Sequence, residues 1–317
     1  MQAEQPARVG IIEWLMEGDP SIRWQVMRDL EPTPEAVWTA EQRRVAGEGW
    51  GARLLSHQDE SGRWTPHLYG KKWISTTYSM VLLRQLGLPA GDPRALRACA
   101  LFLDEGLMED GGIDFSITRV GSDVCVTAMV LAVFEWFGFD DPRRHRLLDF
   151  LLSSQLADGG WNCERRATHG SFHTTISVLE ALQENSRAQG PRPADTSVAE
   201  ARGRDFFLRH RLFRSHRTGE VVDERMLRFS FPPRWHFDVL RGLDYFRSAG
   251  SLDDERLIDG IEVVQRKQLG DGRWLLQQRW PGATWFEMEQ VGAPSRWNTL
   301  RAMRVLETWR AGRPDQI

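Results

Sequence analysis

The chain has 317 residues, 41% of them hydrophobic, and a formal net charge of −3 at pH 7. Its acidic and basic residues are interspersed, which argues against a nucleic-acid-binding protein, and three cysteines in so long a chain argue against a disulfide framework and suit a reducing compartment. The first ten residues lack the apolar core of a signal peptide, and no apolar run reaches the roughly 20 residues that span a bilayer, so we expect a cytoplasmic protein.

Helical periodicity predicts the elements along the chain. "IIEWLMEGD", "PSIRWQVMRDL" and "TPEAVWTAEQRRVAGE" predict three helices near the N-terminus. Beyond them, apolar residues recur at i, i+3, i+4 and i+7, which marks helices with one buried face. These inner helices are expected at 73–87, 123–138, 172–184, 235–247 and 296–308. More highly charged outer helices are expected at about 93–105, 142–155, 197–210 and 254–268, and strand patterning is nearly absent.

Three segments share one pattern: "LLSHQDESGRW" (54–64), "LLSSQLADGGW" (151–161) and "VQRKQLGDGRW" (264–274). Each has an apolar residue, a Gln, a short polar turn and then Gly-x-Trp. The spacing between their tryptophans is about twice the roughly 40–50 residues of a helix-hairpin repeat, which predicts a degenerate copy in each gap. Residues 101–115 and 206–222 fit those places, so five units follow one another.

Helix pairs with an inner and an outer layer stack either into an open solenoid or into a ring. About six pairs with inner helices of this length favour closure. We therefore expect one all-α domain over residues 1–317, an (α/α)6 toroid of inner and outer helices. Residues 1–45 would close the ring and residues 46–311 would carry the repeats.

The Gln…Gly-x-Trp units resemble the "QW" repeats of squalene–hopene cyclases. Over residues 45–311 the whole pattern is similar to the α/α toroid shared by those cyclases and protein prenyltransferase β-subunits. The resemblance implies a fold and leaves the function open. Within it, the Gln and Trp of each unit are expected to clamp neighbouring helices.

All inner helices of such a ring start at one rim, so the residues near their starts face one another across the mouth of the cavity. The residues expected at this rim are Lys71, Lys72, Asp123, Cys125, His173, Arg234, His236 and Arg296. The two lysines and two arginines are candidates for substrate binding, and the other four are candidates for catalysis. Because the chain is rich in tryptophan, we expect an aromatic, apolar cavity below, which suits a ligand with an anionic head and an apolar tail.

Aligning "VLAVF" with "VLEAL" places Cys125 and His173 at equivalent positions of consecutive inner helices, with Asp123 two residues before the thiol. Carboxylate, thiolate and imidazole are ligands that zinc accepts together. The segments "DVC" and "FHTT" resemble the zinc site of protein prenyltransferase β-subunits, which implies Asp123, Cys125 and His173 as ligands, with Cys163 as a possible extra one. The alternative stays open that Asp123 caps the helix, Cys125 is a small buried side chain and His173 is a hydrogen-bonded core residue.

Squalene–hopene-type cyclases carry Asp-x-Asp-Asp-Thr-Ala at this helix entrance, and the central Asp protonates the alkene. The corresponding stretch, "DVCVTA", has Cys125 in place of that acid and Val126 in place of the next. A thiol with a pKa near its reference value of about 8.5 is a poor proton donor to an alkene. The substitution therefore argues against cyclisation that starts by protonation.

Two classes of function follow from these observations. One is an enzyme similar to prenyltransferases or terpene cyclases, acting on an isoprenoid diphosphate with or without Zn²⁺. The other is a non-catalytic toroid that binds a lipid or a peptide. The acceptor in the first case is a small molecule, a peptide or the isoprenoid itself, and the sequence gives no evidence of a separate partner subunit.

Overall fold

The computed structural model describes residues 4–70, 72–116, 121–164, 166–189 and 194–313. Its α-helices are α1 (Glu4–Met16), α2 (Pro20–Asp29), α3 (Glu35–Arg43), α4 (Gly49–Leu55), α5 (Thr76–Leu86), α6 (Pro93–Gly106), α7 (Val124–Phe137), α8 (Arg144–Ser153), α9 (Phe172–Gln189), α10 (Ala194–Arg209), α11 (Val239–Ser248), α12 (Ile258–Arg266) and α13 (Arg296–Ala311). The extended pairings in these residues are isolated bridges only. The all-α prediction is confirmed.

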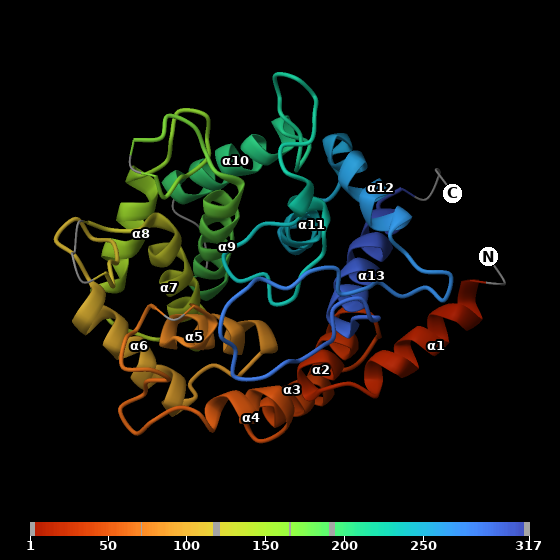
Figure 1. Ribbon diagram of the computed structural model, residues 1–317, viewed down its shortest axis with the longest axis horizontal. Helices are drawn as coiled ribbons and strands as arrows, with labels where there is room; N and C mark the ends of the chain where they lie inside the picture. The colour runs from red at the N-terminus through yellow and green to blue at the C-terminus, as the bar shows by residue number, and fades with distance from the viewer. Residues whose placement is uncertain (1–3, 71, 117–120, 165, 190–193, 314–317) are drawn as a thin grey trace.

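The helices alternate between an inner and an outer layer (Figure 1). Helices α5, α7, α9, α11 and α13 lie around the centre, while α6, α8, α10 and α12 lie outside them. The two ends of the chain meet, because Arg304 of α13 donates hydrogen bonds to Gln25 and Asp29 of α2. Helix α2 thereby completes the inner layer. No helix in the described part of the chain combines the length and apolar character that a membrane crossing requires.

The expected inner helices are present, and their starts follow the local capping chemistry. The carboxylate of Asp123 accepts a hydrogen bond from Val126 N, and Ser295 caps Asn298 N in the same way. The helix expected at 235–247 instead begins at Val239, because Asp238 is its N-cap and accepts from Arg241 N. Residues before such a cap are not helical.

The three Gln…Gly-x-Trp units form the same turn. Trp64, Trp161 and Trp274 are buried, and each indole donates to a carbonyl ten residues earlier in the chain, at Leu54, Leu151 and Val264. The backbone N–H of each Trp donates to a threonine hydroxyl in the following inner helix, at Thr76, Thr175 and Thr299. In the degenerate unit at 101–115, Ile113 N donates to the hydroxyl of Thr127 in the same way.

The glutamines of two units also reach the next outer helix. Gln58 Nε2 donates to Arg94 O of α6, and Gln155 Nε2 donates to Ala199 O of α10. Gln268 makes only the local bond within its turn, to Gly272 O. Each unit thus ties the end of one outer helix to the inner helix after it, and two of them tie in the next outer helix as well.

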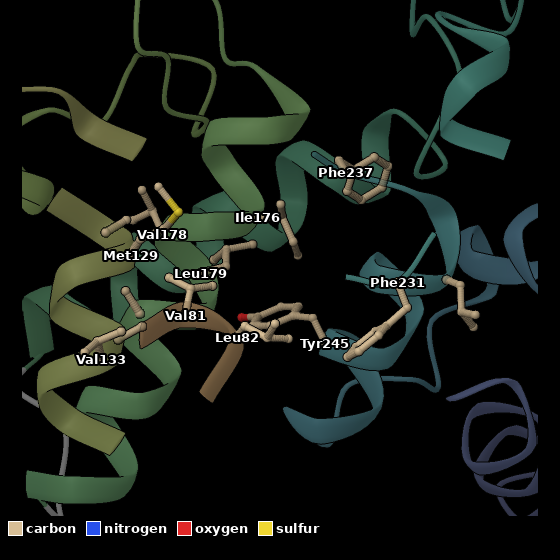
Figure 2. Close-up of a cluster of buried hydrophobic side chains, with 14 of the residues drawn as sticks. Val81, Leu82, Met129, Val133, Ile176, Val178, Leu179, Phe231, Phe237 and Tyr245 are labelled. Atoms are coloured by element: carbon tan, nitrogen blue, oxygen red, sulfur yellow. The ribbon is translucent and has the colours of Figure 1, made fainter. Parts of the chain in front are cut away.

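A cluster of buried apolar side chains joins several of the inner helices (Figure 2). Leu82 of α5, Met129 of α7, Leu179 of α9 and Tyr245 of α11 belong to one buried cluster. Every residue of α7 except Trp136 is buried. Helix α7 therefore lies within the packed core.

A long irregular segment, residues 277–294, lies between α12 and α13 in the sequence and crosses the centre of the ring (Figure 1). We call this segment the strap. Trp73, just before α5, donates its indole N–H to Trp280 O of the strap at 3.0 Å. Farther along, the rings of Trp285 and His57 stack with centroids 4.3 Å apart. Both contacts fasten the strap to the segment between α4 and α5.

Candidate functional site

The entrance of α7 gathers three metal-ligand side chains. Donor atoms of Asp123, Cys125 and Cys163 all lie within 4.8 Å of one another. Cys163 Sγ donates to Asp123 Oδ1 at 3.4 Å, and the hydroxyl oxygen of Thr174 lies 3.2 Å from both sulfurs. Asp123 and Cys125 come from the first turn of α7, Thr174 from the first turn of α9, and Cys163 from the loop between α8 and α9.

This donor set fits zinc. Zinc takes thiolate sulfur at about 2.3 Å and carboxylate oxygen at about 2.0–2.2 Å, so the three donors need only small shifts to share one ion. Three protein ligands leave a fourth position open, as in catalytic rather than structural zinc sites. The hydrogen bond with Cys163 and burial raise the pKa of the Cys125 thiol well above its ordinary value. The Cys125 thiol is then protonated at neutral pH, and a metal would displace that proton.

The structure corrects the predicted role of His173. Its Nδ1 accepts a hydrogen bond from Phe237 N at 2.8 Å, at the entrance of α11. Burial, followed by the nearby Arg241, lowers the pKa of His173 to about 4, so the ring is neutral near pH 7. With Nδ1 as acceptor, the proton of the neutral ring sits on Nε2, and neither nitrogen offers a free lone pair to a metal. Cys163 takes the place that His173 was expected to fill.

His173 does not join Cys125 because side chains at equivalent positions of the repeat point toward different neighbours. Cys125 and His173 do sit at equivalent positions, each two residues before a threonine that bonds the preceding turn. Each side chain, however, points toward the next inner helix. Cys125 contacts Thr174 of α9, and His173 contacts Phe237 just before α11. Equivalent residues of a ring therefore need not meet.

A belt of aromatic rings runs from Tyr69 to His173. The hydroxyls of Tyr69 and Tyr78 are 2.9 Å apart, and Tyr78 packs edge-on against Trp73 with ring centroids 4.8 Å apart. Trp73 in turn contacts His236, whose ring lies 5.5 Å from that of His173. The His236 ring is stacked between two indole rings, that of the neighbouring Trp235 and that of Trp280 in the strap. Burial and, to a smaller extent, the neighbouring His173 lower the pKa of His236 to about 3. The His236 ring is therefore a neutral part of the belt.

Of the four predicted cations, two lie at this belt. Lys72 Nζ lies 5.5 Å from the ring centroid of Trp73 and the Arg234 guanidinium 5.3 Å from it. Lys72 is exposed, whereas Arg234 is only 7% exposed and its Nη1 is buried without a hydrogen-bond partner. Arg234 lines a small pocket of about 40 Å³ under the strap, where burial lowers its pKa to about 10.

The other two predicted cations do not extend this group. Arg296 is turned away, because its Nε donates to Trp14 O and its guanidinium packs 4.5 Å from the Trp14 ring. It joins α13 to α1. Lys71 lies outside the described residues.

The large cavity differs from the aromatic, apolar one that we expected. It measures about 570 Å³ and is lined by aromatic rings together with seven arginine and four acidic side chains. It lies on the side of the C-terminal ends of α2, α5 and α9 rather than beside the metal-ligand cluster. Phe231, whose ring stacks on Trp297 at 3.9 Å, lines both this cavity and the small pocket under the strap. A hydrocarbon chain fits poorly among so many charges.

Some features of the site had weak sequence signals. Tyr69 and Tyr78 are two of only three tyrosines and lie nine positions apart around "KKW". Thr174 could be found only by placing it beside Cys125, which requires knowing how α9 is rotated against α7. The charged cavity has no local signal, because its arginines come from five separate helices.

No protein-family model matches the chain, and no curated protein matches it. Among solved structures, a variant of the type II terpene cyclase MstE from Scytonema, in complex with the product merosterolic acid A, is 16% identical with a TM-score of 0.49; the match covers 93% of this chain and 88% of that chain. The apo form of the same cyclase is 17% identical with a TM-score of 0.48, covering 93% and 89%. A protein from Actinoplanes is 17% identical with a TM-score of 0.45, covering 92% and 90%.

Proposed function

We propose that the chain is an enzyme of the prenyltransferase or terpene-cyclase type that acts on an isoprenoid substrate at the strap-covered mouth of its ring. The observation that carries the proposal is the convergence of Asp123, Cys125 and Cys163 at the start of α7. The repeat units and the Asp-x-Cys pair, both similar to those of such enzymes, support the same assignment. The proposal replaces His173 with Cys163 in the ligand set.

Asp123, Cys125 and Cys163 would hold a zinc ion. When bound, zinc supplies Lewis-acid activation of a nucleophile in its open position. Thr174 would hold the two sulfurs in place, since its hydroxyl is within hydrogen-bonding distance of both. The carboxylate of Asp123 stays oriented because it also caps α7.

The neighbouring residues have separable roles in this proposal. Burial raises the pKa of Tyr69 to about 12, so its phenol stays protonated and can donate a hydrogen bond to a substrate oxygen. Arg234, a buried cation with an unpaired Nη1, would bind the anionic head group and stabilise the charge of a leaving diphosphate.

The metal assignment is tested by the zinc content of purified, zinc-reconstituted protein. Wild type should hold about one equivalent, and Cys125→Ala and Cys163→Ala should lose most of it. Cys99→Ala is the matched control, because Cys99 is a buried thiol in α6 outside the cluster. His173→Asn should keep its zinc. A folded wild type that binds no zinc, or a Cys163→Ala protein that retains it, would overturn the assignment.

The activity is tested by incubating the zinc-loaded protein with farnesyl and geranylgeranyl diphosphate, measuring diphosphate release and identifying products by mass spectrometry. Turnover that is lost in Arg234→Gln supports the proposal. Saturable binding of the isoprenoid without any turnover would reject the enzyme and favour the alternative of a non-catalytic lipid-binding toroid.

A further inference from the structure

The large charged cavity plays no part in the function proposed above, and none of the metal-ligand residues lines it. Its walls come from the last turns of α2 and α5, the second half of α9, and from α11 and α13. Because the inner helices run side by side, a ligand here would touch most of the ring at once.

The cavity carries more positive than negative charge. Seven arginines line it, against the carboxylates Asp29, Glu180, Glu184 and Asp244. Asp238, behind the wall, pairs with Arg301 at 3.8 Å and adds a fifth carboxylate. Even with that carboxylate included, two guanidinium groups remain in excess.

One of the three deepest cations, Arg301, is incompletely neutralised. Arg241, Arg301 and Arg304 are each less than a tenth exposed. Arg241 pairs with Glu180 at 2.7 Å, but both carboxylates near Arg301 are 3.8 Å away. Burial, with repulsion from Arg304, lowers the pKa of Arg301. A buried cation with such distant partners gains most from an additional anion.

Two residues in the cavity walls also carry donors without partners, which favours an anionic ligand. Gln183 Nε2 and Arg84 Nε, on two residues that line the cavity, are buried and have no hydrogen-bond partner. Buried donors without partners cost stability unless something accepts from them. An oxyanion supplies acceptors only.

The geometry points to a binding site for a small organic molecule that carries several oxyanion charges, either phosphoryl groups or carboxylates. All the cations that line the cavity are arginines, whose planar forks match such oxygens two at a time. The volume of about 570 Å³ is that of a small-molecule site. Trp136 in the wall is partly exposed and offers a flat face for the organic part of the ligand.

The test uses the full-length protein and two probes, diphosphate and citrate, titrated calorimetrically at constant ionic strength. Saturable binding of either is expected, and the stronger probe tells phosphoryl from carboxylate recognition. Arg187→Gln should weaken binding about fivefold, the loss of one charge-assisted hydrogen bond. Its side chain is half exposed, so the fold should survive. Arg266→Gln on α12, an exposed arginine away from the cavity, is the matched control and should bind as wild type.

Gln183→Glu gives a sharper second variant. The side chain keeps its acceptor for Ser248 Oγ, while an anionic oxygen replaces the unpaired donor. We expect this variant to lose binding of both probes and to melt at the same temperature as the ligand-free wild type or higher. The inference is overturned if neither probe binds, if Gln183→Glu binds as wild type, or if Arg187→Gln and Arg266→Gln behave alike. Zinc content is unaffected in every case, so the two proposals fail independently.

Discussion

Two adjacent threonines at the start of α9 have different partners. The Thr174 hydroxyl lies 3.2 Å from Cys125 Sγ and from Cys163 Sγ, whereas the Thr175 hydroxyl accepts from Trp161 N. One supports the candidate metal centre and the other supports the fold, because successive helix residues point about 100° apart.

This difference gives a matched pair of variants. Thr174→Val should weaken zinc binding by about 10- to 100-fold, as expected for loss of a hydrogen bond to a ligand, with little change in stability. Thr175→Val should leave zinc affinity unchanged but cost about 1–3 kcal/mol of unfolding free energy, because it strands the buried Trp161 N–H. Zinc competition titrations and urea denaturation separate the two effects. Equal zinc affinities in both variants would contradict the role given to Thr174.

The half-buried histidines at the mouth make stability depend on pH. His173 and His236 have their pKa values lowered to about 4 and about 3, below the unfolded value of 6.5. Between pH 6.5 and about 4 the unfolded state therefore binds more protons than the folded state, so stability falls as the pH falls through this window and is fully present above it. Each histidine contributes a slope of at most about 1.4 kcal/mol per pH unit.

His173→Asn tests this contribution. The asparagine oxygen can still accept from Phe237 N but does not titrate. The pH dependence of the urea midpoint should become shallower by about one proton between pH 6.5 and 4, with stability near pH 7 almost unchanged. His145→Asn, at an exposed position near the start of α8, is the control and should keep the wild-type slope. An unchanged slope in His173→Asn would show that His173 is accessible and protonates freely.

At the scale of the element, the Gly-x-Trp turn is the unit that fixes how each outer helix meets the next inner one. Its indole N–H, its backbone N–H and a threonine hydroxyl make the same bonds in all three clear copies. Because the local bonds are identical, the three tryptophans should respond alike to substitution.

Truncation of Trp64, Trp161 or Trp274 to Ala should cost about 3–5 kcal/mol each, the usual loss for a buried indole. Trp161→Phe keeps most of the ring volume but strands Leu151 O, so we expect about 1–3 kcal/mol. Trp285→Phe, in the strap and only half buried, should cost less than any of these. Urea denaturation measures all five variants, and a loss below about 1 kcal/mol for the alanine variants would remove the structural role of the turn.

At the scale of the whole molecule, the ring closes through an ion-pair network. Arg304 pairs with Asp29 of α2 at 2.9 Å and with Asp244 of α11, so one guanidinium joins three inner helices. Asp244 is half-buried, and its pKa lies below the ordinary range although burial alone would raise it, since Arg304 and Arg247 stabilise its charge.

Arg304→Met should therefore lower the unfolding free energy by about 1–3 kcal/mol, because Asp29 and Asp244 lose the cation that they share and keep only Arg28 and Arg247 as close partners. Asp244→Asn in the Arg304→Met background should recover part of that loss, since it removes one of the two carboxylates that lost a partner. The exposed pair Arg266–Glu262 on α12 provides the comparison, and its removal should cost at most about 1 kcal/mol. Denaturant titrations of the single and double variants supply these values.

Much of the fold could be predicted because its signals are local. Apolar periodicity, Asp and Ser caps, and the Gly-x-Trp turn each act within one or two helical turns, so the expected inner helices at 123–138 and 296–308 match α7 and α13 closely. The sequence also placed Asp123 and Cys125 together at a helix entrance, because two residues in one turn share their surroundings.

The partners of those residues were decided by the tertiary structure alone. Whether Cys125 meets His173, Thr174 or Cys163 depends on how α9 is rotated against α7 and on the course of a loop, and neither leaves a trace in the periodicity of a helix. In the same way, the charge of the central cavity is a sum over arginines from five helices, each of which reads as an ordinary charged residue in its own segment. Local interactions select the elements, whereas the packing between elements selects which side chains converge, and binding and catalysis depend on that convergence.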